Sequence, residues 1–109
     1  MGKFVLAVRT RPVPGSEEDY HEWYDKYHLD EVLAIPDFVT AERFEWWDGD
    51  HRAGAGQGDH LALFTVESGD IDVTIETFRK AQKSMKVPPC LDPDSVSLQW
   101  WRSLGTHTP

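Results

Sequence analysis

Two strand-like segments of this chain are apolar on both of their alternating faces. They are the runs FVLAV at 4–8 and LALF at 61–64. Side chains alternate between the two faces of a sheet, so a sheet that contains such strands must be covered on both sides. The chain has 109 residues, which is enough for one domain, 1–109, but leaves few elements to supply that cover.

Local patterns predict four strands and two helices in the order β-α-β-β-α-β. Alternation of β-branched and aromatic residues predicts the strands, and Ser16 followed by three acidic residues predicts the N-cap of a helix. The predicted elements are a strand 3–9, a helix from Ser16 to about His28 or Leu33, strands 38–47 and 60–67, a helix 71–84 and a strand 95–104.

This order is that of an α+β, ferredoxin-like βαββαβ fold, a four-stranded antiparallel sheet with two helices on one face. Paired tryptophans at 46–47 and 100–101 would place indoles on both sides of their strands. The second face therefore needs a cover, and the sheet of a twin subunit is the simplest one. We expect a homodimer that associates sheet to sheet.

Charge and composition narrow the classes of partner. Eleven basic and nineteen acidic residues give a net charge of −8, which repels phosphate backbones and anionic lipids, so we expect neither nucleic acid nor a membrane surface as partner. No apolar run has the length of a transmembrane helix and the first twenty residues lack a signal-peptide core, so we expect a cytoplasmic protein. Cys90 is the only cysteine; we predict a small buried side chain and not a nucleophile.

The segment 48–59 (DGDHRAGAGQGD) is a polar, glycine-rich stretch. Its glycines lack the GxGxxG and GxxxxGK spacings and lead into a strand, where no helix N-terminus can meet a phosphate. We therefore predict a flexible loop that is suited to act as a lid.

The segment WYDKYHLDE at 23–31 resembles a known family motif. With IPDF at 35–38 and AERF at 41–44, it is similar to the WYDxxHxPE…PGFxxARRY pattern of small EthD-like members of the dimeric α/β-barrel superfamily. Asp30 and Asp37 stand where these relatives often carry proline and glycine. The resemblance implies a homodimer whose two sheets face each other as a barrel, with a pocket in each subunit between sheet and helices.

What the resemblance implies about activity is broad. Many relatives bind no organic cofactor, and we expect none here. The superfamily includes polyketide cyclases, muconolactone isomerases, dehydratases, quinone-forming monooxygenases and haem-handling enzymes, among which the fold alone does not choose.

His28 is the candidate general acid/base. Asp25 lies three residues earlier, close enough on a helix to accept a hydrogen bond from one ring nitrogen and to fix the tautomer. Tyr24 or Tyr27 would then hydrogen-bond a developing oxyanion, and Arg43 would hold a substrate carboxylate or phenolate. The competing structural interpretation is a helix-terminal histidine partnered by Asp25, tyrosines of the core, and Arg43 paired with a neighbouring glutamate.

At about 100° per residue, one helix face carries an aromatic seam that includes Tyr20, Tyr24 and Tyr27, bordered by His28. Leu29 and Leu33 fall outside that arc, which means either that the helix bends near His28 or that another face is buried. The full set of predicted substrate-binding residues is Tyr20, Trp23, Tyr27, Glu31, Trp46, His60 and Trp100.

Metal ligation is a competing use of the same helix, because His21, Asp25 and His28 lie within about 60° of arc. We predict no metal, since His21 follows an acidic, surface-like run.

The leading hypothesis is a cofactor-independent lyase, isomerase or cyclase that acts on a hydrophobic, aromatic, oxygenated small molecule. His28 would be its general acid/base, oriented by Asp25. The alternatives are a cofactor-free monooxygenase of phenolic substrates and a non-catalytic ligand-binding accessory protein of a degradative oxidising system.

Overall fold

A computed structural model describes residues 1–47 and 58–109 of the chain. Four antiparallel strands form one sheet in the order β2-β3-β1-β4. The strands are β1 (Gly2–Thr10), β2 (Phe38–Glu45), β3 (His60–Ser68) and β4 (Ser97–Arg102). This arrangement confirms the predicted ferredoxin-like α+β fold.

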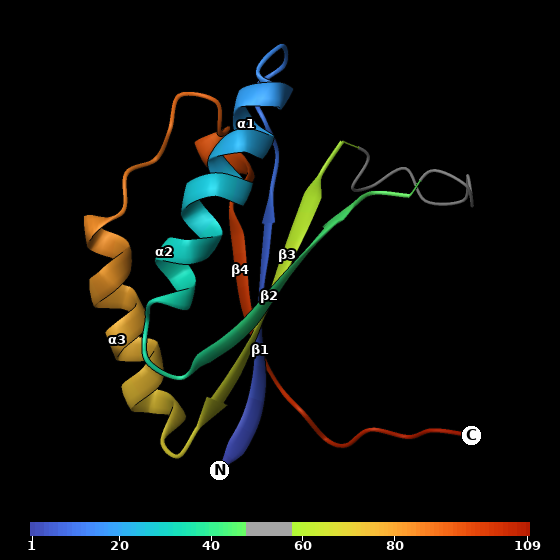
Figure 1. Cartoon of the computed structure of the whole chain (residues 1–109), viewed down its shortest axis with the longest axis vertical. Coiled ribbons are helices and arrows are strands. Elements are labelled where there is room, and N and C mark those ends of the chain that lie inside the picture. The colour runs from blue at the N-terminus through green and yellow to red at the C-terminus, as the bar shows by residue number, and fades with distance from the viewer. Residues whose placement is uncertain (48–57) are drawn as a thin grey trace.

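The helices cover one face of this sheet, and no helix or strand of the described residues covers the other face, which we call the uncovered face (Figure 1). The first helical stretch has three consecutive parts: α1 (Glu17–Trp23), the π-helical turn η1 (Tyr24–His28) and α2 (Leu29–Leu33). Later in the chain follow α3 (Ile71–Ser84) and the 3₁₀ turn η2 (Pro93–Ser95). Within the described residues, no helix is both long and apolar enough to cross a membrane.

Strand alternation places the core between the sheet and the helices. Leu6 and Val8 of β1 and Phe64 and Val66 of β3 point toward the helices and are buried. Trp100 of β4 joins them in an aromatic cluster with the core phenylalanines. Trp101, the next residue, is 58% exposed on the other face, so the prediction of indoles on both sides of this strand is confirmed.

A bulge at Val39 sets which side chains of β2 face the helices. The register passes from Phe38 opposite Val66 to Thr40 opposite Thr65, so Val39 has no partner residue. One unpaired residue reverses the alternation of every residue that follows. As a result, both Phe38 and Arg43 face the helical layer, although an uninterrupted strand would place them on opposite faces.

Several predicted boundaries require correction. Ser16 precedes α1, but its side chain makes no capping hydrogen bond, because its backbone lies outside the usual extended N-cap conformation. Asp70, which caps α3 by accepting a hydrogen bond from the Val73 amide, was not predicted. The second strand ends at Glu45 instead of Trp47, and the turn η2 replaces the beginning of the predicted last strand.

The two departures from the family pattern have clear local structures. Asp37 adopts a left-handed φ of 76°, a conformation that aspartate tolerates better than most residues. Its carboxylate accepts a hydrogen bond from the Thr74 hydroxyl at 2.6 Å, which fixes the turn against α3. Asp30 lies inside α2, where it keeps the backbone N–H that a proline would lack. Its carbonyl accepts a hydrogen bond from the Ala34 amide at 3.0 Å.

The segment that follows α3 is attached to the end of β1. The Val13 amide donates to the Cys90 carbonyl at 2.8 Å and the Asp92 amide donates to the Arg11 carbonyl at 3.0 Å. Cys90 is buried, as predicted, and burial raises the pKa of its thiol. These bonds hold the segment across one end of the space between sheet and helices.

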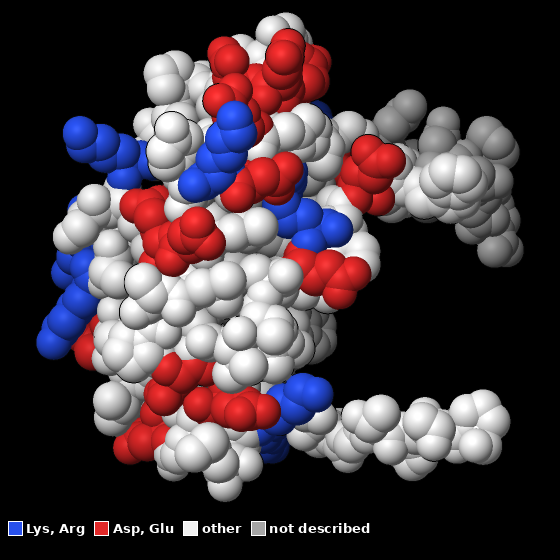
Figure 2. Space-filling view, viewed as in Figure 1, with Lys and Arg blue, Asp and Glu red and all other residues white. Residues whose placement is uncertain are grey.

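Acidic side chains gather over α1 and recur along the helical side of the molecule (Figure 2). This distribution agrees with the net charge of −8. The predicted lid, residues 48–59, falls mainly on 48–57, which lie outside the described residues.

Candidate active site

A cavity of about 120 Å³ lies between the sheet and the helical layer. Its walls come from three strands, from both helical segments and from the chain that follows α3. The lining residues are Val8, Thr10, Trp23, Tyr24, His28, Val32, Phe64, Phe78, Gln82, Met85, Lys86, Val87, Leu91, Val96 and Leu98. Most of this wall is apolar, and its neutral polar side-chain groups are two hydroxyls, an amide, an imidazole and the indole N–H of Trp23.

The π-helical turn η1 brings His28 to this cavity. The inward-facing residues Tyr20, Tyr24, His28 and Val32 recur every fourth position. In an uninterrupted α-helix, each such step would drift by about 40° around the axis. In a π turn, each amide bonds to the carbonyl five residues earlier instead of four. The turn is therefore wider and absorbs part of this drift. Such turns are frequent at functional sites.

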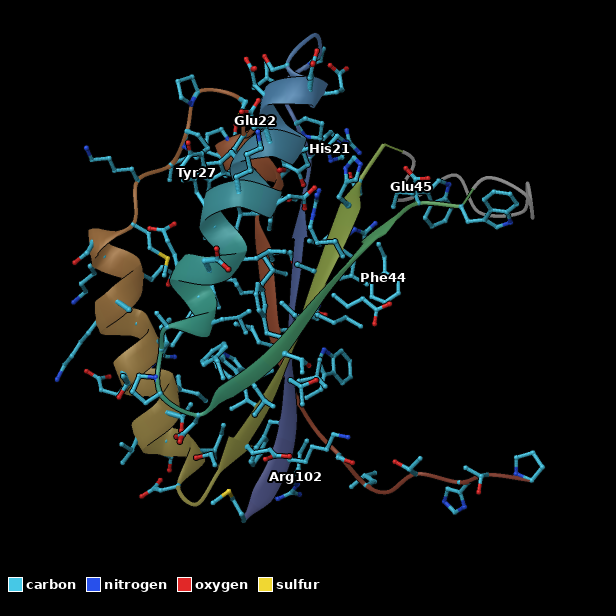
Figure 3. All side chains as sticks on the ribbon, in the orientation of Figure 1. His21, Glu22, Tyr27, Phe44, Glu45 and Arg102 are labelled. Carbon is cyan, nitrogen blue, oxygen red and sulfur yellow. The ribbon has the colours of Figure 1, made fainter. Side chains whose placement is uncertain are left out.

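The π turn also explains the two leucines that did not fit the predicted face. Leu29 and Leu33 pack against the core, whereas Tyr27 is 63% exposed. Tyr27 lies on the outer side of the helical layer (Figure 3). The prediction that Tyr27 shares the buried face is therefore wrong, because it assumed a uniform period of 3.6 residues.

The partner of His28 is Glu31 and not Asp25. The imidazole Nδ1 lies 3.1 Å from Glu31 Oε1, one turn later in the helix. A carboxylate only accepts hydrogen bonds, so Nδ1 carries the proton and Nε2 is the nitrogen that remains for a substrate. The predicted Asp25 contact is wrong, because Asp25 points outward and binds Arg43.

The His28 ring is largely enclosed. It stacks on the indole of Trp23 with 4.3 Å between ring centroids and lies edge-on to Tyr24. Burial lowers the pKa of His28, and the hydrogen bond and negative charge of Glu31 oppose that change only in part. The imidazole is therefore neutral near pH 7, as a general base requires.

Two tyrosines and a threonine form the polar end of the site. The Thr10 and Tyr20 hydroxyl oxygens are 2.5 Å apart, and both residues are buried. Burial raises the pKa of Tyr24 to about 12, against the opposing effects of a hydrogen bond to Thr10 and the charge of Arg43. Tyr24 thus keeps its proton and lines the cavity, whereas Tyr20 does not line it.

Arg43 lies behind Tyr24, outside the cavity. Its Nη1 donates to Asp25 Oδ1 at 2.8 Å, its Nη2 lies 3.0 Å from His21 Nδ1, and its guanidinium carbon is 4.5 Å from the centroid of the Tyr24 ring. His21 projects from α1 toward the ends of β2 and β3 (Figure 3). Arg43 therefore supports Tyr24 from the far side and does not line the cavity where a substrate carboxylate would lie.

The remaining predicted residues divide between the site and other places. Trp23 lines the cavity and Glu31 lies beside it, in contact with His28. Trp100 packs in the core against Phe38 and Phe78, and neither Trp46 nor His60 lines the His28 cavity. Trp46 and His60 instead line a separate concavity at the uncovered face of the sheet.

Of the lining residues, only Trp23, Tyr24 and His28 were predicted as site residues; Thr10, Gln82 and Met85 are among those that were not. Thr10 ends a strand, and the other two lie one turn apart on or just after α3, far from His28 along the chain. The sequence indicates Thr10 only through the alternation of β1, which turns it toward the helices. It indicates Gln82 and Met85 only through their position on the same helix face as Phe78.

No three histidine, cysteine, aspartate or glutamate side chains within 1–47 and 58–109 are arranged to hold a metal ion. The three residues considered as metal ligands, His21, Asp25 and His28, do not converge. His21 and Asp25 both contact Arg43, whereas His28 contacts Glu31.

The fold matches those of solved proteins at low sequence identity. A mutant of MhuD with two manganese protoporphyrin IX molecules bound per active site is 13% identical, with a TM-score of 0.63 over 97% of this chain and 99% of that one. An EthD family protein from Bacillus halodurans C-125 is 11% identical, with a TM-score of 0.56 over 93% of this chain and 99% of that one. A mutant of SnoaB, a cofactor-independent oxygenase from Streptomyces nogalater, is 10% identical, with a TM-score of 0.54 over 99% and 97%.

These matches show the fold: the chain has a ferredoxin-like fold similar to that of an EthD family protein, so the predicted resemblance is confirmed at the level of the fold alone. No family model and no curated protein matches the sequence.

Proposed function

We propose that the chain is a cofactor-independent enzyme that moves a proton to or from a hydrophobic, aromatic, oxygenated small molecule, in a lyase, isomerase or cyclase reaction. The observation that carries this proposal is the Glu31-bound imidazole of His28 on the wall of a mainly apolar cavity. Apolar cavities with a few converging polar groups and perturbed pKa values are the usual form of small-molecule sites.

Each polar group has a distinct role in this mechanism. Neutral His28 removes the substrate proton through Nε2, and the Glu31 carboxylate stabilises the imidazolium that forms. Tyr24 donates its phenolic proton in a hydrogen bond to the oxygen on which negative charge develops. Two residues hold Tyr24 in place: Thr10 forms a hydrogen bond with its hydroxyl, and Arg43 packs on the face of its ring.

The first test compares two acidic residues of the same helical stretch. Glu31→Gln should slow the exchange of the methyl hydrogens of acetophenone in deuterium oxide by about tenfold at pH 7, because an amide stabilises the imidazolium less than a carboxylate does. The pH at which the exchange rate of this variant falls on acidification should also be lower, since Glu31 raises the pKa of His28. Asp25→Asn should leave that pH unchanged, because Asp25 contacts Arg43.

Nuclear magnetic resonance measures the exchange across the pH range. In the unmodified protein, the rate should fall as the pH decreases through the pKa of His28, which lies below its ordinary value of 6.5. A shift caused by Asp25→Asn and not by Glu31→Gln would reject Glu31 as the partner. Binding of acetophenone without any catalysed exchange would instead support a ligand-binding accessory protein.

A cofactor-free monooxygenase is the second candidate, favoured by the likeness of the fold to that of SnoaB. It would use the same first step, because removal of a proton from a phenol leaves an electron-rich anion that oxygen can oxidise. Oxygen uptake with phenolic substrates distinguishes the two, since a lyase, isomerase or cyclase consumes none.

We also propose that the enzyme is a homodimer formed through the uncovered face of the sheet. The middle of that face is apolar, with Val5, Leu61, Leu63 and Trp101, and Phe44 projects from β2 on the side away from the helices (Figure 3). A twin sheet would cover these residues and close a barrel of the kind that the fold class forms.

Leu63→Glu tests this interface. A charge at the centre of the face should convert the dimer to a monomer, because burying an unpaired carboxylate is costly. Light scattering coupled to size exclusion measures the mass. The matched control is Val73→Glu on the exposed side of α3, which should keep the dimer; a monomeric unmodified protein would refute the interface.

A further inference from the structure

We infer that the site takes uncharged compounds with a single ring, and that Met85 sets its upper size limit. This inference depends on the proposed function, whose substrate class it narrows. It excludes polycyclic compounds and haem as ligands of this cavity, although a protein of similar fold binds a metalloporphyrin at its active site.

The volume of the cavity limits the size of its ligand. The cavity measures about 120 Å³. An apolar cavity of roughly 150 Å³ in another protein holds one benzene molecule. A porphyrin contains four pyrrole rings and their bridges, so it is much larger than this cavity.

The walls that define this volume are firmly packed. Phe64 on β3 is 1% exposed, and Phe78 on α3 stacks on Phe38 with 5.8 Å between centroids and meets the edge of Trp100. Enlarging the cavity at these positions would disturb a close-packed core, which costs stability. The sheet side and the middle of α3 therefore act as fixed walls.

The charges around the cavity favour a neutral ligand. Lys86 is the only lysine or arginine among the described lining residues, and it is exposed at the rim. The other polar groups are neutral at pH 7, because burial keeps Tyr24 protonated and His28 deprotonated. Arg43, the residue expected to hold a carboxylate, lies behind Tyr24 and is already bound to Asp25. A ligand carboxylate next to His28 and Tyr24 would thus be buried with no cation in the described lining other than exposed Lys86, which is unfavourable.

Met85 is the adjustable part of the wall. It follows α3 and continues the stripe of Phe78 and Gln82, which lie on the same face of the helix. Unlike Phe78, it is only partly buried, and its unbranched thioether side chain fills irregular gaps. Truncation at this position would extend the cavity toward Lys86 without altering the aromatic core.

Isothermal titration calorimetry with phenol, benzoate, 1-naphthol and haem tests the inference. Phenol should bind at least about tenfold more tightly than each of the other three, even though 1-naphthol has more apolar surface to bury. Met85→Ala should strengthen 1-naphthol binding by about tenfold, because the removed side chain leaves space that the second ring fills. Val73→Ala, on the exposed side of α3, should bind all four as the unmodified protein does.

Circular dichroism establishes that each variant is folded, and Met85→Val replaces Met85→Ala if the latter unfolds. Benzoate or 1-naphthol binding as tightly as phenol, or no binding of phenol, would overturn the substrate class. Unchanged 1-naphthol affinity in the folded Met85 variants would overturn the assignment of the size limit. These outcomes are independent of the acetophenone exchange, so the proton-transfer proposal can fail while the ligand preference stands, and the reverse.

Discussion

Replacement of His28 by alanine should lower the rate constant for acetophenone hydrogen exchange by about a hundredfold or more. A positioned acid/base group contributes about 10²–10⁴-fold to proton transfer, and within the described cavity wall no other side chain has an ordinary pKa near neutrality. The loss should be greatest above the pKa of His28, where the imidazole of the unmodified protein is neutral. Nuclear magnetic resonance in deuterium oxide measures the rates of both proteins.

His21→Ala is the matched control for this experiment. His21 belongs to the same helical stretch and is also partly buried, but its Nδ1 is bound to Arg43 and it does not line the cavity. Its loss should change the rate constant by no more than about threefold, as expected for a residue without contact with the reacting atoms. If His28→Ala keeps near-normal exchange, His28 is not the catalytic base.

Tyr24→Phe should also lower the exchange rate constant by about a hundredfold, since the loss of one preorganised donor to an oxyanion typically costs about 10²–10³-fold. Tyr24 keeps its proton because its pKa is raised to about 12, so it can donate across the whole working range of pH. The rate of the unmodified protein should therefore show no decrease from ionisation of Tyr24 below about pH 11.

Tyr20→Phe tests whether Tyr24 acts by donating a hydrogen bond to the substrate or only by supporting the packing of the site. The Tyr20 hydroxyl contacts Thr10 but does not line the cavity. Its removal should reduce the free energy of unfolding by about 1–2 kcal/mol, the typical cost of losing a buried hydrogen bond, with a smaller effect on the rate. Equal rate losses in Tyr20→Phe and Tyr24→Phe would show that Tyr24 acts only as part of the packing.

The fold was predictable because its signals are local. Alternating apolar runs, a proline-bounded helix and an amphipathic stretch with lysines toward its end identify each element, and α3 was predicted with its observed bounds, Ile71–Ser84. The need to cover a doubly apolar sheet then predicts the layer arrangement. The ends of β2 and β4 were less accurate because tryptophans favour strands in general and do not mark where pairing stops.

The site was predictable only in part, because its geometry depends on interruptions that the residue pattern does not show. His28 was recognised, but a helix of uniform period assigns it to Asp25 and places Tyr27 inward, and η1 reverses both assignments. The bulge at Val39 turns Arg43 to the helical side of the sheet, where it lies behind Tyr24 and outside the cavity. The register of β1 and the stripe on α3 place Thr10 and Met85 on inward faces, but only tertiary packing brings them to the cavity that His28 lines.

The wide turn at Tyr24–His28 means that the composition of the cavity depends on how many residues this helix contains. Shortening that turn by one position would restore ordinary winding and rotate everything after it, so that a different set of side chains would face the sheet. Insertions and deletions here are therefore as consequential for chemistry as replacement of the imidazole itself, and homologues with an intact histidine but a shorter helix should not be assumed to share the reaction.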